Sequence, residues 1–279
     1  MLVKTKKNLV DFESKNLERE LSSCLSELGI NKGASLYITG NMGSLGKIKV
    51  KKSVKLEAFL NSFWNNIGKD GTIFSPAASM NLCNTDIPFD INLTKSHEMG
   101  SFAEYIRALP NSVRSLHPFW SVVGVGAQAQ LLKKVSRHAY GAGSPWSHFL
   151  DLDTVQVNMG VDPSRAVTLI HHVEAVVGVP YRYTKEFFHP IVVKEKIEYM
   201  SFYQSVFYTE SKIKKRFALN QHYFKELELR GQIQSSKHSS GLEFKAFKMR
   251  DFYKVAIDFF IDDIYNYLEE VPDIKPYIK

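Results

Sequence analysis

The first pattern in the chain is an amphipathic stretch that predicts a helix over 14–28. Its apolar residues recur every three or four positions and fall on one helical face: Leu17, Leu21, Cys24, Leu25 and Leu28. Short apolar runs and further amphipathic stretches then alternate. They predict strand 35–39, helix 54–67, strand 72–75, helix 101–109, strand 122–125, helix 127–135 and strand 155–159. This alternation predicts an α/β fold in which helices pack against a sheet.

The last part of the chain has a different pattern. The pair Asp162–Pro163 suits the cap and the first position of a helix over 163–177. Beyond it we expect strands within 191–203, a helix over 215–229, a hairpin over 232–248 and a terminal helix over 251–268. We therefore predict a single domain, residues 1–279, built as a layered mixed sheet flanked by helices. The core, 1–185, carries the chemistry, and a smaller C-terminal α+β portion, 186–279, shapes the acceptor pocket.

Composition limits the class of protein. The 279 residues include 44% hydrophobic and 23% charged residues, which is typical of a globular protein. The net charge of +7 favours phosphate-bearing partners, but no nucleic-acid-binding motif is present, so we expect none of that class. We also expect no membrane span and no secretory signal, and the two cysteines are too few for a disulfide framework. The expectation is a cytoplasmic protein, with homo-oligomerisation left open.

The most distinctive motif is Thr-Leu-Ile-His-His-Val-Glu at 168–174. On a helix, His171 and Glu174 lie three residues apart on one face. A carboxylate in that position orients an imidazole and raises its basicity, as a general base for an amine or a hydroxyl requires. The alternative is a plain helix with two partly buried histidines and a surface glutamate. The spacing lacks the paired histidines of zinc proteases, so we expect no metal.

Three loops near predicted strand ends carry further polar or glycine-rich sequence. Residues 40–46 contain three glycines, which let backbone N–H groups approach an anion, but the loop matches no nucleotide motif. Residues 114–121 place a guanidinium, an imidazole and hydroxyls just before a strand, where α/β proteins bind ligands. Residues 138–145 form a glycine-rich turn that ends in Ser-Pro. Each loop is also compatible with hydroxyls that merely satisfy the backbone.

Taken in order, these segments resemble the aminoglycoside 3-N-acetyltransferase family, whose fold differs from that of the GNAT enzymes. The segments that carry the resemblance are Ser44-Leu45-Gly46, Asp70-Gly71-Thr72, Met99-Gly100, Arg114–Ser121, His138–Pro145 and Thr168–Glu174. The resemblance covers residues 33–182, with a weaker continuation to the terminal helix. One departure is Thr39-Gly40-Asn41-Met42, which stands where the family usually has His-Ser-Ser-Leu.

The resemblance implies transfer of an acyl group, usually acetyl, from coenzyme A to a sugar amine, without a metal. It makes His171 the general base and Glu174 its orienting partner. It implies coenzyme contacts from Ser44, Leu45, Gly46, Arg114, Ser115, His117, Ser121 and Ser144. We expect acceptor contacts from Asp90, Thr168, His172, Tyr181 and Arg182. Direct transfer is expected, because no nucleophile motif is present.

The chemical class of the acceptor is open to more than one hypothesis. Aminoglycosides are polycations that need an acidic pocket, whereas this chain is basic and places Arg182 and Lys185 among tyrosines. We therefore expect a nucleotide-linked amino sugar, of the kind used in lipopolysaccharide and other surface polysaccharide synthesis. One alternative is an aminoglycoside, held by local acids among Asp86, Asp90, Glu98 and Glu104, which would confer antibiotic resistance. Another is an inactive coenzyme-A-binding module.

Overall fold

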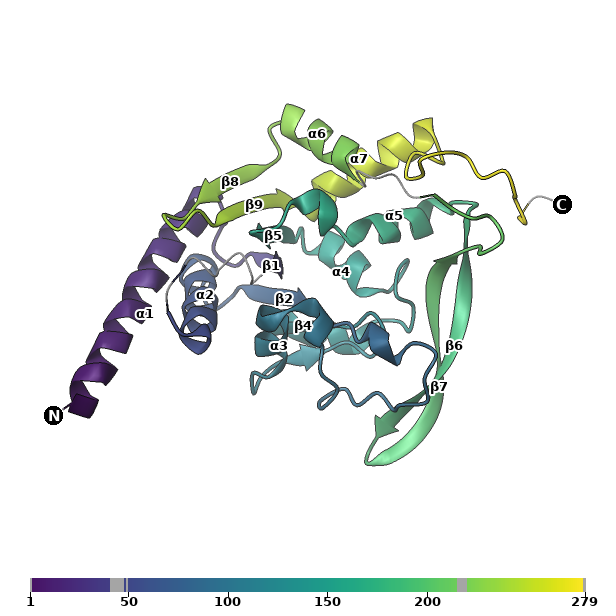
Figure 1. The fold of residues 1–279 in the computed structure, drawn as a ribbon. Coiled ribbons are helices and arrows are strands. Elements are labelled where there is room, and N and C mark those ends of the chain that lie inside the picture. Colours follow the sequence, from purple (N-terminus) through teal and green to yellow (C-terminus); the bar gives the residue numbers. More distant parts are fainter. Residues whose placement is uncertain (1, 41–47, 49, 215–219, 278–279) are drawn as a thin grey trace.

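A seven-stranded mixed sheet forms the centre of the protein (Figure 1). The computed structural model describes residues 2–40, 48, 50–214 and 220–277. The strands, in spatial order, are β3 (Val113–Arg114), β4 (Val122–Gly126), β2 (Thr72–Pro76), β1 (Ser35–Gly40), β5 (Val155–Met159), β9 (Glu243–Lys248) and β8 (Gln234–Lys237). β1 runs parallel to β2 and β5, and every other neighbouring pair is antiparallel. The predicted layered mixed sheet is confirmed.

Helices cover both faces of this sheet. They are α1 (Leu2–Glu27), α2 (Lys52–Ile67), α3 (Ser101–Arg107), α4 (Pro145–Asp151), α5 (Leu169–Val177), α6 (Gln221–Leu229) and α7 (Met249–Asp262). Successive residues of β1 alternate between two cores: Leu36 and Ile38 pack under α1 and α2, and Tyr37 packs under α4, α5 and α7. Because both faces are buried, the strand reads as a continuous apolar run. Among the described helices, none has the length and apolar character to cross a membrane.

The C-terminal portion shares this sheet and core with the rest of the chain. β9 pairs with β5, and β8 extends the sheet beyond it, which confirms the hairpin expected over 232–248. Phe247 of β9 and Phe252 of α7 belong to the same cluster as Tyr37 of β1 and Phe74 of β2. The C-terminal helices therefore fix the position of α5, against which α7 packs.

Three expected helices differ in type or length from what their apolar patterns predict. The stretch 163–177 contains a short 3₁₀ helix, η5 (Pro163–Arg165), and α5 begins only at Leu169. Asp162 does cap η5, since its carboxylate accepts the Ser164 N–H at 2.9 Å. The side-chain amide of Gln156 on β5 stabilises the non-helical segment between η5 and α5 by donating to the Ala166 carbonyl at 3.0 Å. The stretch expected as helix 127–135 is likewise a 3₁₀ helix, η4 (Ala129–Lys134), and α7 stops at Asp262 rather than at residue 268.

A long β-hairpin stands beside the central sheet as a separate two-stranded sheet (Figure 1). Its strands, β6 (Arg182–Val193) and β7 (Lys196–Phe207), exceed the strands expected within 191–203, because few of their residues are buried and they carry no clean alternation. Several contacts fasten the hairpin to the body, and three of them involve the carbonyls of Pro190 and Tyr203. Phe89 N–H donates to the Pro190 carbonyl at 2.9 Å, Ala139 N–H donates to the Tyr203 carbonyl at 2.8 Å, and His117 Nε2 lies 3.4 Å from that carbonyl.

Candidate active site

His171 and Glu174 form a hydrogen-bonded pair on α5. Nδ1 of His171 lies 2.6 Å from Oε2 of Glu174, as expected for residues one helical turn apart. The side chain of His171 is 24% exposed, whereas that of Glu174 is fully buried. The imidazole therefore reaches solvent while its partner is sealed in the protein. The alternative reading, with a surface glutamate, is wrong.

Tyr181 and Arg182 hold the second oxygen of this carboxylate. Gly178 ends α5 in the left-handed conformation, with φ of +70°, and the chain then turns back along the helix. The Tyr181 hydroxyl donates to Oε1 of Glu174 at 3.0 Å, and Nε of Arg182 donates to it at 2.9 Å. The guanidinium also stacks 3.8 Å from the centre of the Phe207 ring. Both side chains, expected to contact the acceptor, are bound to Glu174 in the structure, and Nη2 of Arg182 also lies 3.3 Å from Nδ1 of His171.

The charge on Glu174 is stabilised from both sides. Burial raises the pKa of its carboxyl, but the hydrogen bond from His171 and the charge of Arg182 outweigh that effect and lower the pKa overall. The group is therefore an ionised carboxylate that accepts the Nδ1–H of His171. This assignment leaves a lone pair on Nε2, which makes no hydrogen bond to any residue the structure describes. The geometry is that of an oriented general base.

Two tyrosines that the sequence analysis did not identify flank the imidazole. The ring centre of Tyr140 lies 5.5 Å from that of His171, and the ring centre of Tyr267 lies 5.9 Å from it, both in edge-to-face arrangements. Tyr140 comes from the glycine-rich turn 138–145, and Tyr267 comes from the segment after α7. Only Tyr140 had a sequence signal, because the glycine-rich turn that contains it was already a candidate loop.

The neighbouring His172 does not face the acceptor side with His171. It is buried, and its Nδ1 accepts the Gly141 N–H at 3.2 Å and lies 3.4 Å from the Ser144 hydroxyl. Ser144 itself donates to the Gly141 carbonyl at 2.7 Å. These contacts tie the glycine-rich turn to α5, so the turn is fixed relative to the base. They leave the Ser144 hydroxyl buried, and its expected contact with the coenzyme stays a prediction.

The segment 114–121 is likewise built into the interior. Ser115 accepts the Val122 N–H at 2.9 Å through its hydroxyl, and Ser121 donates to the Ala77 carbonyl at 2.7 Å. His117 accepts the Trp120 N–H on Nδ1 at 3.1 Å, while its Nε2 meets the hairpin. The structure gives these residues packing and anchoring contacts. Their expected contacts to a coenzyme have no direct support in it.

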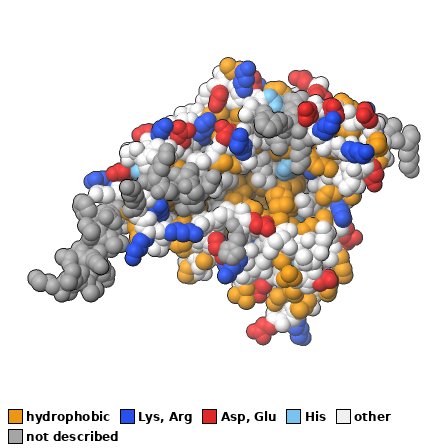
Figure 2. Space-filling view, in the orientation of Figure 1, with side chains coloured by type: hydrophobic (Ala, Val, Ile, Leu, Met, Phe, Trp, Pro, Cys, Tyr) orange, Lys and Arg blue, Asp and Glu red, His pale blue; other side chains and the backbone are white. Residues whose placement is uncertain are grey.

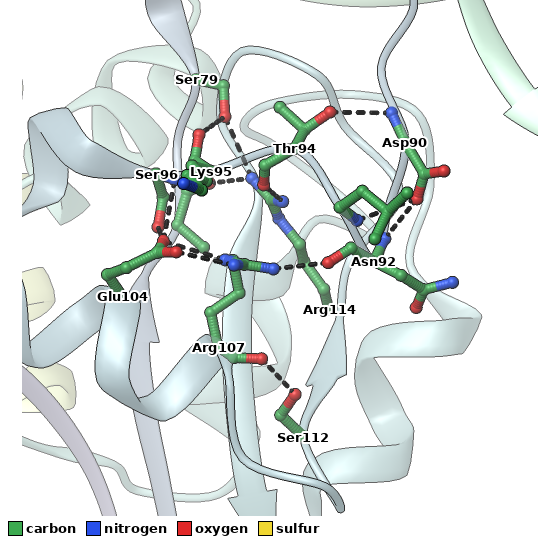
Figure 3. A network of polar contacts seen from close by, with 12 residues as sticks. Ser79, Asp90, Asn92, Thr94, Lys95, Ser96, Glu104, Arg107, Ser112 and Arg114 are labelled. Atoms are coloured by element: carbon green, nitrogen blue, oxygen red, sulfur yellow. Dashed lines mark hydrogen bonds and ion pairs between the residues drawn. The ribbon is translucent and has the colours of Figure 1, made fainter.

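Arg114 holds the long loop that follows β2. Its buried guanidinium donates to the carbonyls of Ala77 and Thr94, and to the hydroxyls of Ser79 at 3.1 Å and Ser121 at 2.9 Å (Figure 3). Burial lowers the pKa of Arg114 to about 10, so it remains a cation at neutral pH. The positive charge of Arg114 is therefore bound to acceptors of the protein itself, and it anchors the loop.

Replacing Arg114 with methionine is expected to destabilise the protein by about 2–4 kcal/mol, because several buried acceptors lose their donor. The KM for the acyl donor should change little. Urea unfolding and steady-state kinetics measure the two effects. Arg137→Met, at an exposed arginine, is the control and should change neither quantity. A selective rise in KM with unchanged stability in Arg114→Met would instead restore the expected coenzyme contact.

Two buried histidines make stability depend on pH. Burial lowers the pKa of His117 and of His172 to about 4, against 6.5 for the free group. Both are therefore neutral in the folded protein. Their contribution to stability is complete above pH 6.5 and is lost as the pH falls toward 4, because the unfolded chain then binds protons that the native state does not.

The free energy of unfolding is thus expected to fall by about 2–3 kcal/mol per histidine between pH 6.5 and pH 4. Urea unfolding across this range measures the slope. His172→Gln should reduce the slope by roughly one proton. An unchanged slope in this variant would show that His172 is protonated in the native state.

The remaining expected site residues are spread more widely. Asp90 caps its own loop, since its carboxylate accepts the N–H groups of Asn92 at 2.8 Å and Leu93 at 2.9 Å. Thr168 directly precedes α5, and its carbonyl accepts the His171 N–H. Ser44, Leu45 and Gly46 lie outside the described residues. Within the residues that are described, no group of three or more His, Cys, Asp or Glu side chains is arranged to hold a metal ion.

The acids expected to line an acceptor pocket are also engaged in the structure. Glu104 is bound by Arg107 at 2.6 Å and by the Ser96 hydroxyl at 3.0 Å (Figure 3). The hydrogen bond from Arg107 lowers the pKa of Glu104 to about 2. Glu98 accepts the Met80 N–H at 3.1 Å. Figure 2 shows other acidic side chains gathered at the upper right, where the C-terminal segment lies in Figure 1.

Comparisons with known proteins place the chain in a family. The family model described as aminoglycoside 3-N-acetyltransferase matches residues 38–261. An aminoglycoside N(3)-acetyltransferase III from Salmonella is 25% identical over 177 residues, which cover 58% of this chain and 62% of that protein. Another from Pseudomonas aeruginosa is 24% identical over 204 residues, which cover 66% of this chain and 73% of that protein. The chain thus spans less than two thirds of the first of these relatives.

Solved structures share the fold at lower identity. The crystal structure of aminoglycoside acetyltransferase AAC(3)-Xa has a TM-score of 0.76 and 17% identity, and the match covers 94% of this chain and 99% of that one. The binary complex of AAC-IIIb with CoASH has a TM-score of 0.74 and 18% identity, with 91% and 98% covered. Because the family model spans most of the sequence, including the His171–Glu174 pair, this chain belongs to the aminoglycoside 3-N-acetyltransferase family.

Proposed function

We propose that the protein is an acyl-CoA-dependent N-acetyltransferase that acts on an amino sugar of the aminoglycoside class. The observation that carries this proposal is the pair on α5: an imidazole with an open Nε2, held on its other nitrogen by a buried, ionised carboxylate. Acetyl-CoA is the proposed acyl donor, because AAC-IIIb, which shares the fold, binds CoASH. We place the reaction in the cytoplasm, where this donor is made, and assign it to one domain.

The chemistry follows from what a thioester and an ammonium group need. The acceptor ammonium group releases one proton to solvent and becomes a nucleophilic amine, whose nitrogen then forms a bond to the acyl carbon. Nε2 of His171 takes the second proton during the attack, while Glu174 stabilises the imidazolium that forms. Collapse of the tetrahedral intermediate breaks the C–S bond, and the proton passes to the leaving sulfur. We keep the loop 44–46 as the proposed contact on the thioester side.

An aminoglycoside acceptor fits the structure better than a nucleotide-linked sugar. The nucleotide hypothesis rested on Arg182 and its neighbouring tyrosines, but Arg182 is bound to Glu174 and Tyr181 is buried. Exposed carboxylates of Glu269 and Asp273 follow closely after Tyr267, which contacts the base, while Glu270 of the same segment pairs with Lys214 at 2.7 Å. Local acid beside the site gives a polycation a place to bind despite the basic surface elsewhere. The relatives found by sequence carry the same acceptor class in their names.

An acceptor screen tests this proposal. Purified protein is incubated with acetyl-CoA and one acceptor at a time. The acceptors are sisomicin, a second aminoglycoside of the kanamycin type, and amino sugars linked to UDP or TDP. The release of free thiol measures turnover. We expect turnover with at least one aminoglycoside and none with the nucleotide sugars. Turnover confined to the nucleotide sugars would overturn the acceptor class. Binding of CoA without turnover on any amine would favour an inactive binding module.

A further inference from the structure

A tight turn follows α7 at residues 263–268. Asp263 accepts the Tyr265 N–H at 2.9 Å through its side chain, and its carbonyl accepts the Asn266 side-chain amide at 2.7 Å. Asn266 is buried, and its side-chain oxygen accepts the hydroxyl of Tyr223 on α6. The Leu268 N–H donates back to the Tyr265 carbonyl at 2.8 Å. The turn is therefore a fixed piece of structure anchored to a neighbouring helix.

This turn touches both halves of the His171–Glu174 pair. Tyr267, which is 4% exposed, meets the His171 ring edge to face at 5.9 Å with an interplanar angle of 80°. Tyr265 packs against Tyr181 at 5.9 Å, and the Tyr181 hydroxyl is the one that donates to Glu174. Neither contact is local in sequence, since nearly a hundred residues separate the turn from α5.

We propose that the turn 263–268 is a positioning element for the catalytic pair, and that Tyr267 sets the orientation of the His171 ring. The proposal rests on the proposed function, and it assigns to the C-terminal segment a part in catalysis rather than in acceptor binding alone. Tyr267 acts through His171 and touches neither the donor nor the acceptor in this account.

The physical reason is that one hydrogen bond does not fix an imidazole. Glu174 holds Nδ1, but the ring can still tilt about that bond and swing Nε2 away from the acceptor amine. Two ring contacts limit this tilt: the ring centre of Tyr140 lies 5.5 Å from that of His171, and the ring centre of Tyr267 lies 5.9 Å from it. Removing one of two ring contacts on a general base is expected to lower kcat about 10- to 100-fold, as a loss of orientation does elsewhere.

Tyr267→Ala and Tyr267→Phe test the assignment, with sisomicin and acetyl-CoA as substrates. Tyr267→Ala should lower kcat about 10- to 100-fold and leave KM for acetyl-CoA within about twofold. Tyr267→Phe keeps the ring and should restore kcat to within about threefold of the parent. The matched control is Phe224→Ala, a buried ring of the same core that packs on Phe247 and Phe252. It should lower the melting temperature at least as much while kcat stays near the parent value.

A second readout needs no turnover. The proton on Nδ1 of His171, in a 2.6 Å bond to a carboxylate, should give a downfield NMR signal in the parent and in Tyr267→Phe. That signal should broaden or vanish in Tyr267→Ala. An intact signal together with parental kcat in Tyr267→Ala would overturn the positioning role. A lost signal in a protein that acetylates no amine would uphold the positioning role and reject the proposed function.

Discussion

Replacing His171 by alanine is expected to lower kcat by about 10²- to 10⁴-fold, which is the range that a general base contributes. Acceptor amines are largely protonated at neutral pH, and no other described side chain presents an open imidazole nitrogen beside a buried carboxylate. The KM for acetyl-CoA should remain close to its parental value, because in the proposed mechanism His171 acts on the reacting amine rather than on the coenzyme. Thiol release with sisomicin as acceptor measures both constants.

His172→Gln is the matched control for this change. His172 lies on the same helix and is buried against the glycine-rich turn, so its replacement should cost stability without removing the base. If His171→Ala keeps parental kcat while His172→Gln loses it, the base has been assigned to the wrong histidine.

Glu174→Gln is expected to have the second largest effect, a fall in kcat of about 10²- to 10³-fold. Glutamine has nearly the same shape, but it cannot stabilise the imidazolium by charge and it no longer enforces protonation of Nδ1. It also leaves the buried guanidinium of Arg182 without its anion. We therefore expect lower thermal stability as well, and kinetics should be measured well below the melting temperature.

Glu104→Gln separates these two consequences. Glu104 forms a comparable ion pair with Arg107 at 2.6 Å, outside the His171–Glu174 pair. Its replacement should reduce stability while leaving kcat within about twofold of the parent. Equal losses of kcat in Glu104→Gln and Glu174→Gln would show that the effect comes from general destabilisation.

The parts of the fold that the sequence predicted well are those whose patterns depend on local burial. β1 and β2 carry apolar residues on both faces, β5 alternates apolar residues with the buried polar Gln156 and Asn158, and α2 has one apolar stripe, so the local pattern was sufficient to find them. The hairpin of β8 and β9 was found from its turn. The long hairpin of β6 and β7 was underestimated because few of its residues are buried, so its apolar pattern is weak.

The helix ends that were missed depend on long-range hydrogen bonds. Apolar periodicity continues through 163–177 and through 251–268, so the sequence pattern predicted unbroken helices. In the structure, the side-chain amide of Gln156 donates to the carbonyl of Ala166, and the hydroxyl of Tyr223 donates to the side-chain oxygen of Asn266. Each bond comes from a distant part of the chain, which a local pattern does not encode. Both interruptions lie next to the catalytic pair.

The site divides in the same way. His171 and Glu174 are three residues apart on one helix, so their contact followed from helical geometry. Arg114, Ser115 and His117 share a motif with the family, but their burial and their backbone partners emerge only in three dimensions. Tyr267 had no sequence signal beyond its place within the terminal helix expected over 251–268. Its contact with His171 depends on the turn that replaces the expected end of the helix.

The central claim is that Glu174 holds His171 as the tautomer with a proton on Nδ1 and a lone pair on Nε2. Long-range ¹H–¹⁵N NMR on histidine-labelled protein, assigned by the signals absent from His171→Ala, reports that tautomer directly. We expect the neutral ring of His171 to be in the Nδ1–H form in the parent protein, and in a mixed or Nε2–H form in Glu174→Gln. A neutral His171 with its proton on Nε2 in the parent would contradict it.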